Sequence, residues 1–206
     1  MYLSRIKLDT NRRDTKRAVA SPHVTHASVE SCFDAKNRSI WRFDYLRGNL
    51  YLLLVSEALP NFENFAKQHC GVGIMGESKP YLPVISSIKT GQQLRFRLRG
   101  NTVHSKAGER GTRGKVLPHL TDRHKKLWLV DKSVANGFSL NEDSFELIES
   151  GRQRFWRDSS HVDLTYGVFE GLLVVEDTNL FANALTQGIG RAKAYGCGLI
   201  TVMGSK

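Results

Sequence analysis

The chain has 206 residues, of which 30 are Lys or Arg and 20 are Asp or Glu, so its formal net charge is +10 at neutral pH. A hydrophobic share of 40% is typical of a globular protein and argues against a disordered chain. The longest apolar run, 50–55, is far shorter than the roughly 20 residues of a membrane helix, and no signal-peptide core follows the first residues. Three widely spaced cysteines predict neither a disulfide framework nor a CxxC metal pair. We expect a cytoplasmic protein with no membrane partner, whose basic charge favours a polyanion.

The first half of the chain predicts strands that alternate with helices. Ser21 suits the N-cap of a helix and Pro22 its first position. Arg47-Gly48 suits the turn of a hairpin. The expected elements are a strand over 2–9, a helix over 22–33, strands over 40–45 and 49–56, a helix over 61–69 and a strand over 84–88.

The second half predicts the same order without repeating the sequence. Its elements are a strand over 93–99, a glycine-rich loop over 108–114, a helix over 121–135, extended pieces over 145–149 and 152–157, strands over 162–168 and 172–176, a helix over 179–186 and a strand over 199–203. The helix over 121–135 is expected to bury Leu127, Val130 and Val134. The strands over 162–168 and 172–176 are expected to pair across a turn at Glu170-Gly171. Each half reads β-α-β-β-α-β, so we predict an α+β fold of two tandem ferredoxin-like (RRM-like) domains, 1–89 and 90–206. Because RNA-binding RRMs share this plan, fold and charge together favour RNA, although a fold alone does not establish a function.

One strand places arginine at every second position. Between Leu94 and Arg99 the apolar residues alternate with Arg95, Arg97 and Arg99, so three guanidinium groups share one face. Like charges on one face repel unless an anion covers them, and the arginine fork matches phosphate oxygens. We predict that this face contacts an RNA backbone; a solvated basic face is the alternative.

Two histidines share a face at the start of the first helix. His23 and His26 are three residues apart, and the N-terminus of a helix attracts phosphate. We predict that they perform acid–base chemistry; two histidines without a role are the alternative. No third ligand or acidic cluster accompanies them, so we expect no metal and no cofactor.

The sharpest feature is a glycine-rich segment over 188–198. It follows a helix and precedes a strand, which is the reverse of the Rossmann and P-loop order and argues against a nucleotide cofactor. Glycines let backbone N–H groups approach a ligand, and two cations add charge, so we predict contact with phosphate. A structural turn is the alternative. The residues are Gly188, Gly190, Arg191, Lys193, Gly196 and Gly198.

A third basic motif combines Arg152, Arg154 and Arg157 with Phe155 and Trp156. A basic extended segment with aromatic residues suits insertion against a duplex RNA stem. A solvated strand edge is the alternative.

Taken together, these motifs resemble the CasE family, the endoribonucleases that process precursor CRISPR RNA in subtype I-E systems. The resemblance covers nearly the whole chain and rests on residues 1–5, 22–26, 94–99 and the glycine-rich segment with Lys193. It implies two ferredoxin-like domains, recognition of the stem-loop of a CRISPR repeat RNA and one cleavage at the 3′ base of the stem. It also implies that the enzyme stays on its product as a subunit of the CRISPR surveillance complex.

The resemblance also implies roles for single residues. The family's catalytic histidine falls on His26, while His23 stands where some members have a tyrosine. A lysine of some members falls on Ser31, which we expect to contribute nothing catalytic. Lys193 and Arg191 resemble a loop that contacts phosphate. Because the 2′-hydroxyl of RNA can serve as the nucleophile, we expect a metal-independent cleavage.

Two alternatives remain open. The triplets His23-Val24-Thr25 and His119-Leu120-Thr121 match the HxT pattern of two-histidine phosphoesterases, although each follows a proline and opens a helix rather than lying on a strand. The other alternative is a non-catalytic RNA-binding subunit with the same double fold.

Overall fold

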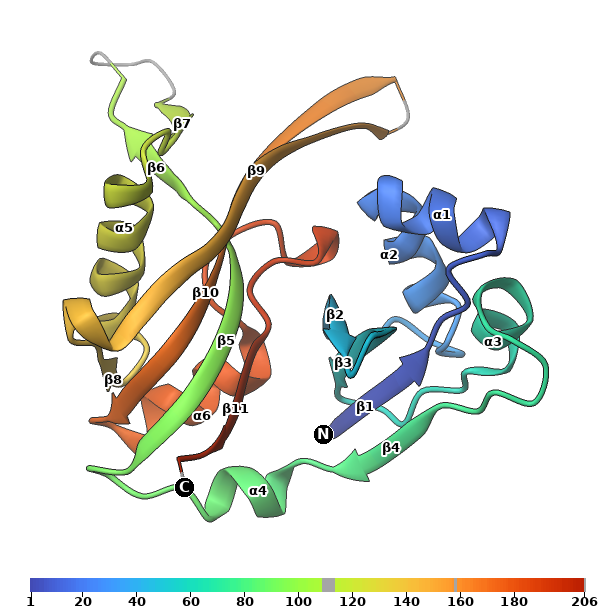
Figure 1. Ribbon diagram of the computed structural model, residues 1–206, viewed down its shortest axis with the longest axis horizontal. Helices are drawn as coiled ribbons and strands as arrows, with labels where there is room; N and C mark the ends of the chain where they lie inside the picture. Colours follow the sequence, from blue (N-terminus) through green and yellow to red (C-terminus); the bar gives the residue numbers. More distant parts are fainter. Residues whose placement is uncertain (109–113, 158, 206) are drawn as a thin grey trace.

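The computed structural model describes residues 1–108, 114–157 and 159–205. Two α+β halves lie side by side, and the short helix α4 (Leu82–Ser86) connects them (Figure 1). The elements of the first half are β1 (Tyr2–Lys7), α1 (Arg13–Ala20), α2 (Pro22–Glu30), β2 (Ser39–Leu46), β3 (Asn49–Ser56), α3 (Glu63–His69) and β4 (Glu77–Pro80).

The first sheet has the strand order β2-β3-β1-β4, and its neighbouring strands are antiparallel. This order is that of a ferredoxin-like sheet. The β2–β3 hairpin turns at Arg47 and Gly48, whose φ angles are 50° and 77°. Positive φ at both central residues gives the tight turn that matches the twist of a hairpin, as the sequence predicted.

The second half follows the same plan with longer strands. Its elements are β5 (Gln93–Asn101), β6 (Val103–Lys106), β7 (Lys115–Pro118), α5 (Asp122–Ala135), β8 (Phe138–Ser139), η1 (Glu142–Ser144), β9 (Phe145–Arg157), β10 (Ser160–Val175), α6 (Thr178–Gln187), η2 (Lys193–Tyr195) and β11 (Ile200–Gly204). The sheet runs β11-β5-β10-β8 with β9 also paired to β10, and β6 and β7 form a separate ribbon. The predicted pair of ferredoxin-like folds is therefore confirmed.

The first half and the linker depart from the predicted elements in three places. Helix α1 was not predicted; it lies between the strand predicted over 2–9 and the helix predicted over 22–33, and it buries only Thr15 and Ala18. Residues 84–88 form no strand, because α4 begins at Leu82. The fourth strand is instead β4, whose four residues are all exposed. Its pairing with β1 defines it, since its sequence has no alternation of apolar residues.

Two predictions for the second half are also wrong. No turn lies at Glu170-Gly171, because β10 continues through both residues. A Cβ on Gly171 would lie 2.2 Å from the carbonyl oxygen of Ser144, so this glycine permits a close approach of η1 rather than a turn. Helix α5 begins after the N-cap Thr121 as predicted, but it buries Trp128 and Leu129. Val134 on its predicted buried face is 76% exposed.

The two halves share apolar contacts. Ile40 and Val55 of the first sheet belong to the same buried cluster as Leu98 and Ile200 of the second. Of the predicted 108–114 loop, residues 109–113 lie outside the described residues. No helix in the described part of the chain is long and apolar enough to cross a membrane.

Candidate nucleic-acid interface and catalytic site

Helix α2 presents both histidines on its less buried face. Thr25 and Val29 are buried, whereas His23 and His26 are half-buried. The Thr25 hydroxyl donates a 2.7 Å hydrogen bond to the carbonyl of Ala18 in α1. On the next turn, Oγ of Ser28 lies 3.1 Å from Nε2 of the buried His69 of α3. Contacts with both neighbouring helices therefore fix the direction in which the two histidines point.

The same contacts remove support from the phosphoesterase alternative. That activity needs two HxT triplets on facing strands, but Thr25 uses its hydroxyl inside the helix pair. The other triplet lies in the second half, where the ring of His119 is 4.7 Å from that of His104 and 6.1 Å from that of His124. The two triplets do not form one site.

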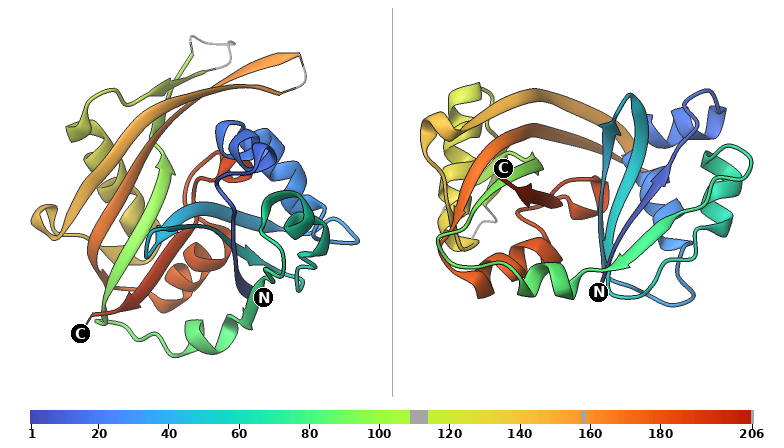
Figure 2. Two further views of the ribbon diagram at one scale, coloured as in Figure 1. Left: turned by 45° about the vertical axis from the view of Figure 1, so that its right-hand side comes forward. Right: turned by 60° about the horizontal axis from the view of Figure 1, so that its bottom comes forward.

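The glycine-rich segment crosses between the halves. Its short helix η2 packs against α2 and against β2, beside the helix that carries the histidines (Figures 1 and 2). Lys193, the first residue of η2, is half-buried. Burial lowers the pKa of its ammonium group, and the nearby positive charge of Arg38 lowers it further. The fold thus brings the predicted histidines and the predicted lysine onto neighbouring elements.

The glycines of this segment have structural reasons to be glycine. Gly188, Gly190, Gly196 and Gly198 all have positive φ, between 73° and 92°. The N–H of Gly188 donates to Ala184 and that of Gly198 to Arg99, so both N–H groups are used within the protein. The alternative of a structural turn accounts for these two bonds. Contact of the four glycines with RNA stays a prediction.

The arginine face of β5 is not a row of three unpartnered charges. Arg97 forms ion pairs with Asp44 and with Glu170. Arg99 donates to Oε1 of Gln153 at 3.0 Å, and its guanidinium lies 4.1 Å from the ring centre of Tyr166. Carboxylate and aromatic groups of the protein therefore already contact two of the three guanidinium groups. Arg95 is exposed, and RNA contact by all three arginines remains a prediction.

The long β9–β10 hairpin divides its arginines between two faces. Arg152 and Arg154 lie on the face of Asp163, which forms ion pairs with both. Arg157 is on the other face and donates to the hydroxyl of Tyr195 in η2 at 3.4 Å. Phe155 on that face packs its ring 4.9 Å from the same tyrosine. One face of the hairpin thus contacts the glycine-rich segment, and the other is open to solvent.

The hairpin also reaches the first half. Nε2 of Gln153 donates to the carbonyls of Val19 and Ala20 at 3.2 and 3.3 Å, at the end of α1. Helix α2 follows directly after these residues. The histidine helix, the glycine-rich segment and the arginine hairpin consequently form one continuous surface.

Comparison with known proteins identifies the family. The model of the family described as CRISPR associated protein matches residues 1–203. The chain belongs to this family. It is 27% identical over 219 residues to the CRISPR-associated endoribonuclease Cse3 of Thermus thermophilus, with 98% of this chain and 99% of that protein covered. It is also 27% identical over 122 residues to the Cascade subunit CasE of Escherichia coli, with 56% and 60% covered.

Solved structures agree with this CRISPR-associated family. Cse3 bound to a 19-nucleotide RNA superposes with a TM-score of 0.81 at 25% identity and covers 98% of this chain and 100% of that one. The pre-cleavage complex of Thermus thermophilus Cse3 with RNA gives the same score and identity, with 98% of each chain covered. Cas6e of Escherichia coli, at 20% identity and a TM-score of 0.70 over both full chains, shares the fold.

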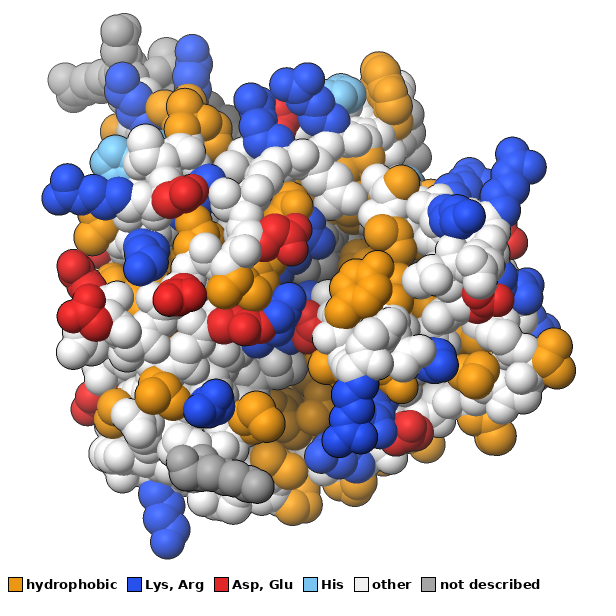
Figure 3. Space-filling model, viewed as in Figure 1, with side chains coloured by type: hydrophobic (Ala, Val, Ile, Leu, Met, Phe, Trp, Pro, Cys, Tyr) orange, Lys and Arg blue, Asp and Glu red, His pale blue; other side chains and the backbone are white. Residues whose placement is uncertain are grey.

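The sequence analysis missed one basic element of this family member. Arg13, Lys16 and Arg17 of α1 are exposed, on the first half, across from the β9–β10 hairpin (Figure 1). In the space-filling view, Lys and Arg side chains gather over both regions (Figure 3). Its signal in the sequence is the high share of basic residues over 10–17, before the helix predicted over 22–33.

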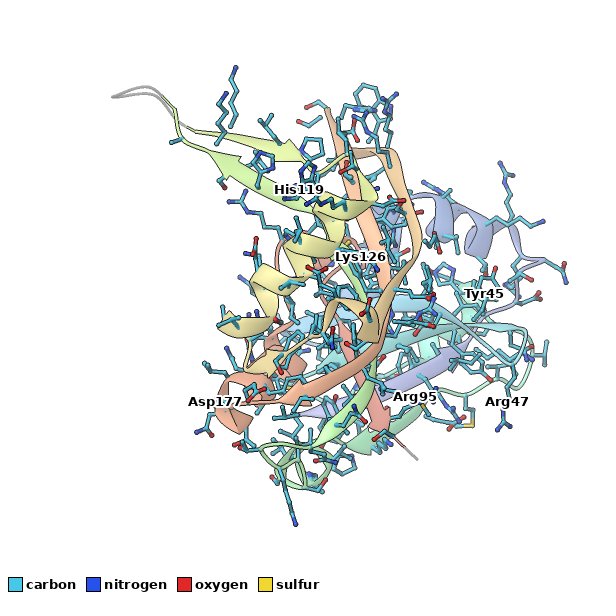
Figure 4. All side chains as sticks on the ribbon, turned by 60° about the vertical axis from the view of Figure 1, so that its left-hand side comes forward. Tyr45, Arg47, Arg95, His119, Lys126 and Asp177 are labelled. Atoms are coloured by element: carbon cyan, nitrogen blue, oxygen red, sulfur yellow. The ribbon has the colours of Figure 1, made fainter. Side chains whose placement is uncertain are left out.

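A recess of about 680 Å³ lies between residues of the two sheets of the CRISPR-associated protein, and Tyr45 and Arg95 line it. Figure 4 labels these two residues. Asp143 and Glu146 line it together with Arg95. These carboxylates make the surroundings of Arg95 less favourable to phosphate than the hairpin. Among the described residues, no group of three or more His, Cys, Asp or Glu side chains is arranged to hold a metal ion.

Proposed function

We propose that this protein is an endoribonuclease that binds the stem-loop of a CRISPR repeat RNA and cleaves it once, at the 3′ base of the stem. One observation carries the proposal: in a chain that matches 99% of the length of the endoribonuclease Cse3, α2 presents two half-buried histidines beside η2 with Lys193. The catalytic helix belongs to a domain of residues 1–89. The hairpin and the glycine-rich segment belong to a domain of residues 90–206.

The chemistry needs only groups that these elements supply. The 2′-oxygen of the nucleotide before the scissile bond attacks the adjacent phosphorus, and the bond from phosphorus to the 5′-oxygen breaks. One proton leaves the 2′-hydroxyl and one is delivered to the 5′-oxygen, so the products carry a 2′,3′-cyclic phosphate and a 5′-hydroxyl. A histidine near neutral pH can perform either transfer, and we assign this role to His26, with His23 as its partner.

Lys193 stabilises the charge that develops on the phosphate. Burial and Arg38 hold its pKa below the ordinary value in the free protein. A phosphate beside the ammonium group favours the charged form and raises this pKa again. The positive charge is therefore strongest when the scissile phosphate is bound.

The RNA stem binds along the basic surface around this site. We assign phosphate contacts to the hairpin, to Arg191 with the neighbouring Gly190 and Gly196, and to the exposed basic residues of α1. Because the Escherichia coli relative is a Cascade subunit, we also assign this protein to a CRISPR surveillance complex in the cytoplasm, where it stays on its product. The further predicted contacts are Arg95, Arg97, Arg99, Arg152, Arg154, Arg157, Gly188 and Gly198.

The test is single-turnover cleavage of the protein's own repeat RNA in EDTA, next to the same RNA with one 2′-deoxy nucleotide before the scissile bond. We expect cleavage of the first and none of the second, with equal binding of both. Cleavage of the deoxy substrate contradicts the mechanism. Tight binding without any cleavage favours the alternative of a non-catalytic RNA-binding subunit.

A further inference from the structure

Strand β2 of the first half lies along the glycine-rich segment of the second half. It is the outer strand of its sheet, in the order β2-β3-β1-β4, so β3 occupies only one of its edges. Helix η2 packs beside it (Figures 1 and 2). This contact is where the element that carries Lys193 meets the half that carries the histidines.

Arg42, in the middle of β2, is 1% exposed and donates five hydrogen bonds, of which three reach the second half and two stay within β2. Its Nε donates to Oδ1 of Asp44 at 2.9 Å, and Nη2 donates to Oδ2 of Asp44 at 2.6 Å. Nη2 also donates to Oγ1 of Thr201 at 2.8 Å. Nη1 donates to the carbonyls of Arg97 at 2.8 Å and Leu199 at 2.6 Å. A guanidinium group has five N–H donors, so every donor is used.

Three of the acceptors belong to the second half and lie at or near the end of the glycine-rich segment. Leu199 directly follows the last glycine of 188–198, and Thr201 belongs to β11. Asp44 also forms an ion pair with Arg97, with Nε of Arg97 3.1 Å from its Oδ1. Arg42 therefore holds the end of the segment, β5 and β11 at one point.

The neighbours of Arg42 touch the rest of the segment. A Cβ on Gly188 would lie 3.2 Å from Cδ1 of Ile40, and a Cβ on Gly196 would lie 2.7 Å from the ring of Trp41. Three consecutive residues of β2 thus contact the beginning, the later part and the end of residues 188–199. Strand β2 therefore packs along the glycine-rich segment.

We propose that Arg42 is a positioning residue for RNA cleavage: it fixes the glycine-rich segment, and with it Lys193, relative to the histidines of α2. The inference rests on the proposed function for its catalytic consequence. Adhesion of the halves does not require a buried charge, because a shared apolar cluster already spans them. Buried ion pairs contribute little net stability, but five directed hydrogen bonds fix one orientation.

The first test measures the segment directly, by amide hydrogen exchange in Arg42→Met and Arg42→Lys. The N–H groups of Ile189 and Gly198 are bonded to Gly198 and Arg99, and they report on the segment. We expect their exchange to be at least about tenfold faster in Arg42→Met, with an intermediate effect in Arg42→Lys, whose single ammonium cannot reach all five acceptors. Exchange in β1 and β3 should not change. Unchanged protection of the segment overturns the inference, whatever the cleavage rate.

The second test is a double-mutant cycle on single-turnover cleavage with saturating enzyme. Since a misplacement of about 1 Å can reduce a rate on the order of 10²-fold, we expect Arg42→Met to lose about 10- to 10²-fold in rate with little change in RNA affinity. In a Lys193→Ala background the same change should add little. Equal losses in both backgrounds contradict positioning of Lys193.

Matched controls separate the outcomes. Arg5→Lys alters an exposed ion pair with Glu77 inside the first sheet, and it should change neither exchange nor rate. If Arg42→Met does not fold, Thr201→Val removes one of the five bonds and gives the same, smaller changes. If the wild-type protein does not cleave its repeat RNA, the proposed function fails, while the exchange experiment still decides whether Arg42 holds the segment.

Discussion

The two halves share a sheet order but differ in what they add to it. The first half has strands of four to eight residues and inserts one extra helix, so that α1 and α2 pack as a pair. The second half extends β9 and β10 to 13 and 16 residues and adds the β6–β7 ribbon and the glycine-rich segment. In the proposed function, the helix with the histidines comes from the first half, and the hairpin and the segment with Lys193 come from the second. The residues that we assign to RNA cleavage therefore lie in these additions rather than in the shared fold.

The regions also differ in which of their basic side chains have partners within the protein. In the second half, Arg97 and Arg99 lie on the strand that looked most like an RNA-binding face, yet their partners are internal. Exposed cations lie on the hairpin and on α1. Counting basic residues along a strand therefore overestimates the number of side chains that are free to bind a ligand. Arg97, for example, forms an ion pair with Asp44 of the first half.

The largest effect on the cleavage rate is expected from a substitution that removes a histidine of the first half and leaves the second half intact. His26→Ala should lose on the order of 10²-fold or more in single-turnover cleavage, because a positioned acid or base contributes about that much. Binding of the repeat RNA should be nearly unchanged, since the hairpin and the segment remain. His23→Ala is expected to have a milder effect unless the two histidines divide the acid and base roles.

The matched control for this prediction is His104→Ala, a histidine of β6 in the other half that touches His119. It should cleave at the wild-type rate. If His26→Ala instead loses binding and cleavage together, α2 contributes affinity rather than chemistry, and the division of roles between the halves is wrong.

Local rules predicted the elements whose signals are local. The alternation in β5, the turn at Arg47-Gly48, the start of α2 at Pro22 and the Thr121 cap of α5 are all present. The elements that were missed depend on distant partners. Strand β4 exists because it pairs with β1, and β10 continues through Gly171 because this residue pairs with Phe96 of β5 and Phe145 of β9.

The candidate site also depends on contacts between residues that are distant in the sequence. The sequence indicated His23, His26 and Lys193 separately, and only the fold could show that α2 and η2 pack together. The internal partner Asp44 of Arg97 is 53 positions away in the sequence (97 minus 44), so no local pattern reveals it. Gln153 and His69, which help to place α2, carry no sequence signal of their own.

The next effect concerns the glycine-rich segment, for which the sequence suggested that Gly190→Val or Gly196→Val harms RNA binding more than folding. The geometry predicts the reverse for Gly196. Its φ is 75°, and a Cβ would lie 2.7 Å from Trp41, a buried residue of the first half. Gly196→Ala should therefore lower stability by about 1–3 kcal/mol and lower the Tm by several degrees.

Thermal unfolding of Gly204→Ala is the control, because its Cβ would meet nothing within 4 Å and its φ is not positive. Gly190→Ala should lie between the two, since its Cβ would approach Trp128 to 3.1 Å. An unchanged Tm for Gly196→Ala with reduced RNA affinity would restore the interpretation made from the sequence.

A smaller effect is expected from the open face of the hairpin. Arg154 is 62% exposed, and its Nε lies 3.5 Å from Asp163, so most of its charge is available to a phosphate. Arg154→Ala should weaken binding of stem-loop RNA by about tenfold and reduce the salt dependence by about one counterion. Single-stranded RNA should be affected less, and Arg5→Ala should affect neither. Equal losses on both RNAs would show that the hairpin does not face a duplex.

The smallest effect is expected in the pH dependence of stability, for which a buried histidine of the first half is compared with an exposed histidine of the second. His69 is 2% exposed, and burial lowers its pKa below the ordinary value, while Asp14 raises it and Arg12 lowers it to a smaller extent. Above an ordinary histidine pKa of about 6.5, the ring is neutral in the folded and the unfolded chain and contributes no pH dependence. As the pH falls below that value, only the unfolded chain takes up the proton, so stability is lost until the pH passes the folded pKa.

His69→Gln keeps a donor for Ser28 without titrating, and its Tm should therefore fall less than that of the wild type between pH 7.5 and 5.5. His161→Gln, which changes an exposed residue of β10, should follow the wild-type slope. If His69→Gln loses as much Tm as the wild type over this interval, His69 is not the group that links the anchoring of α2 to pH.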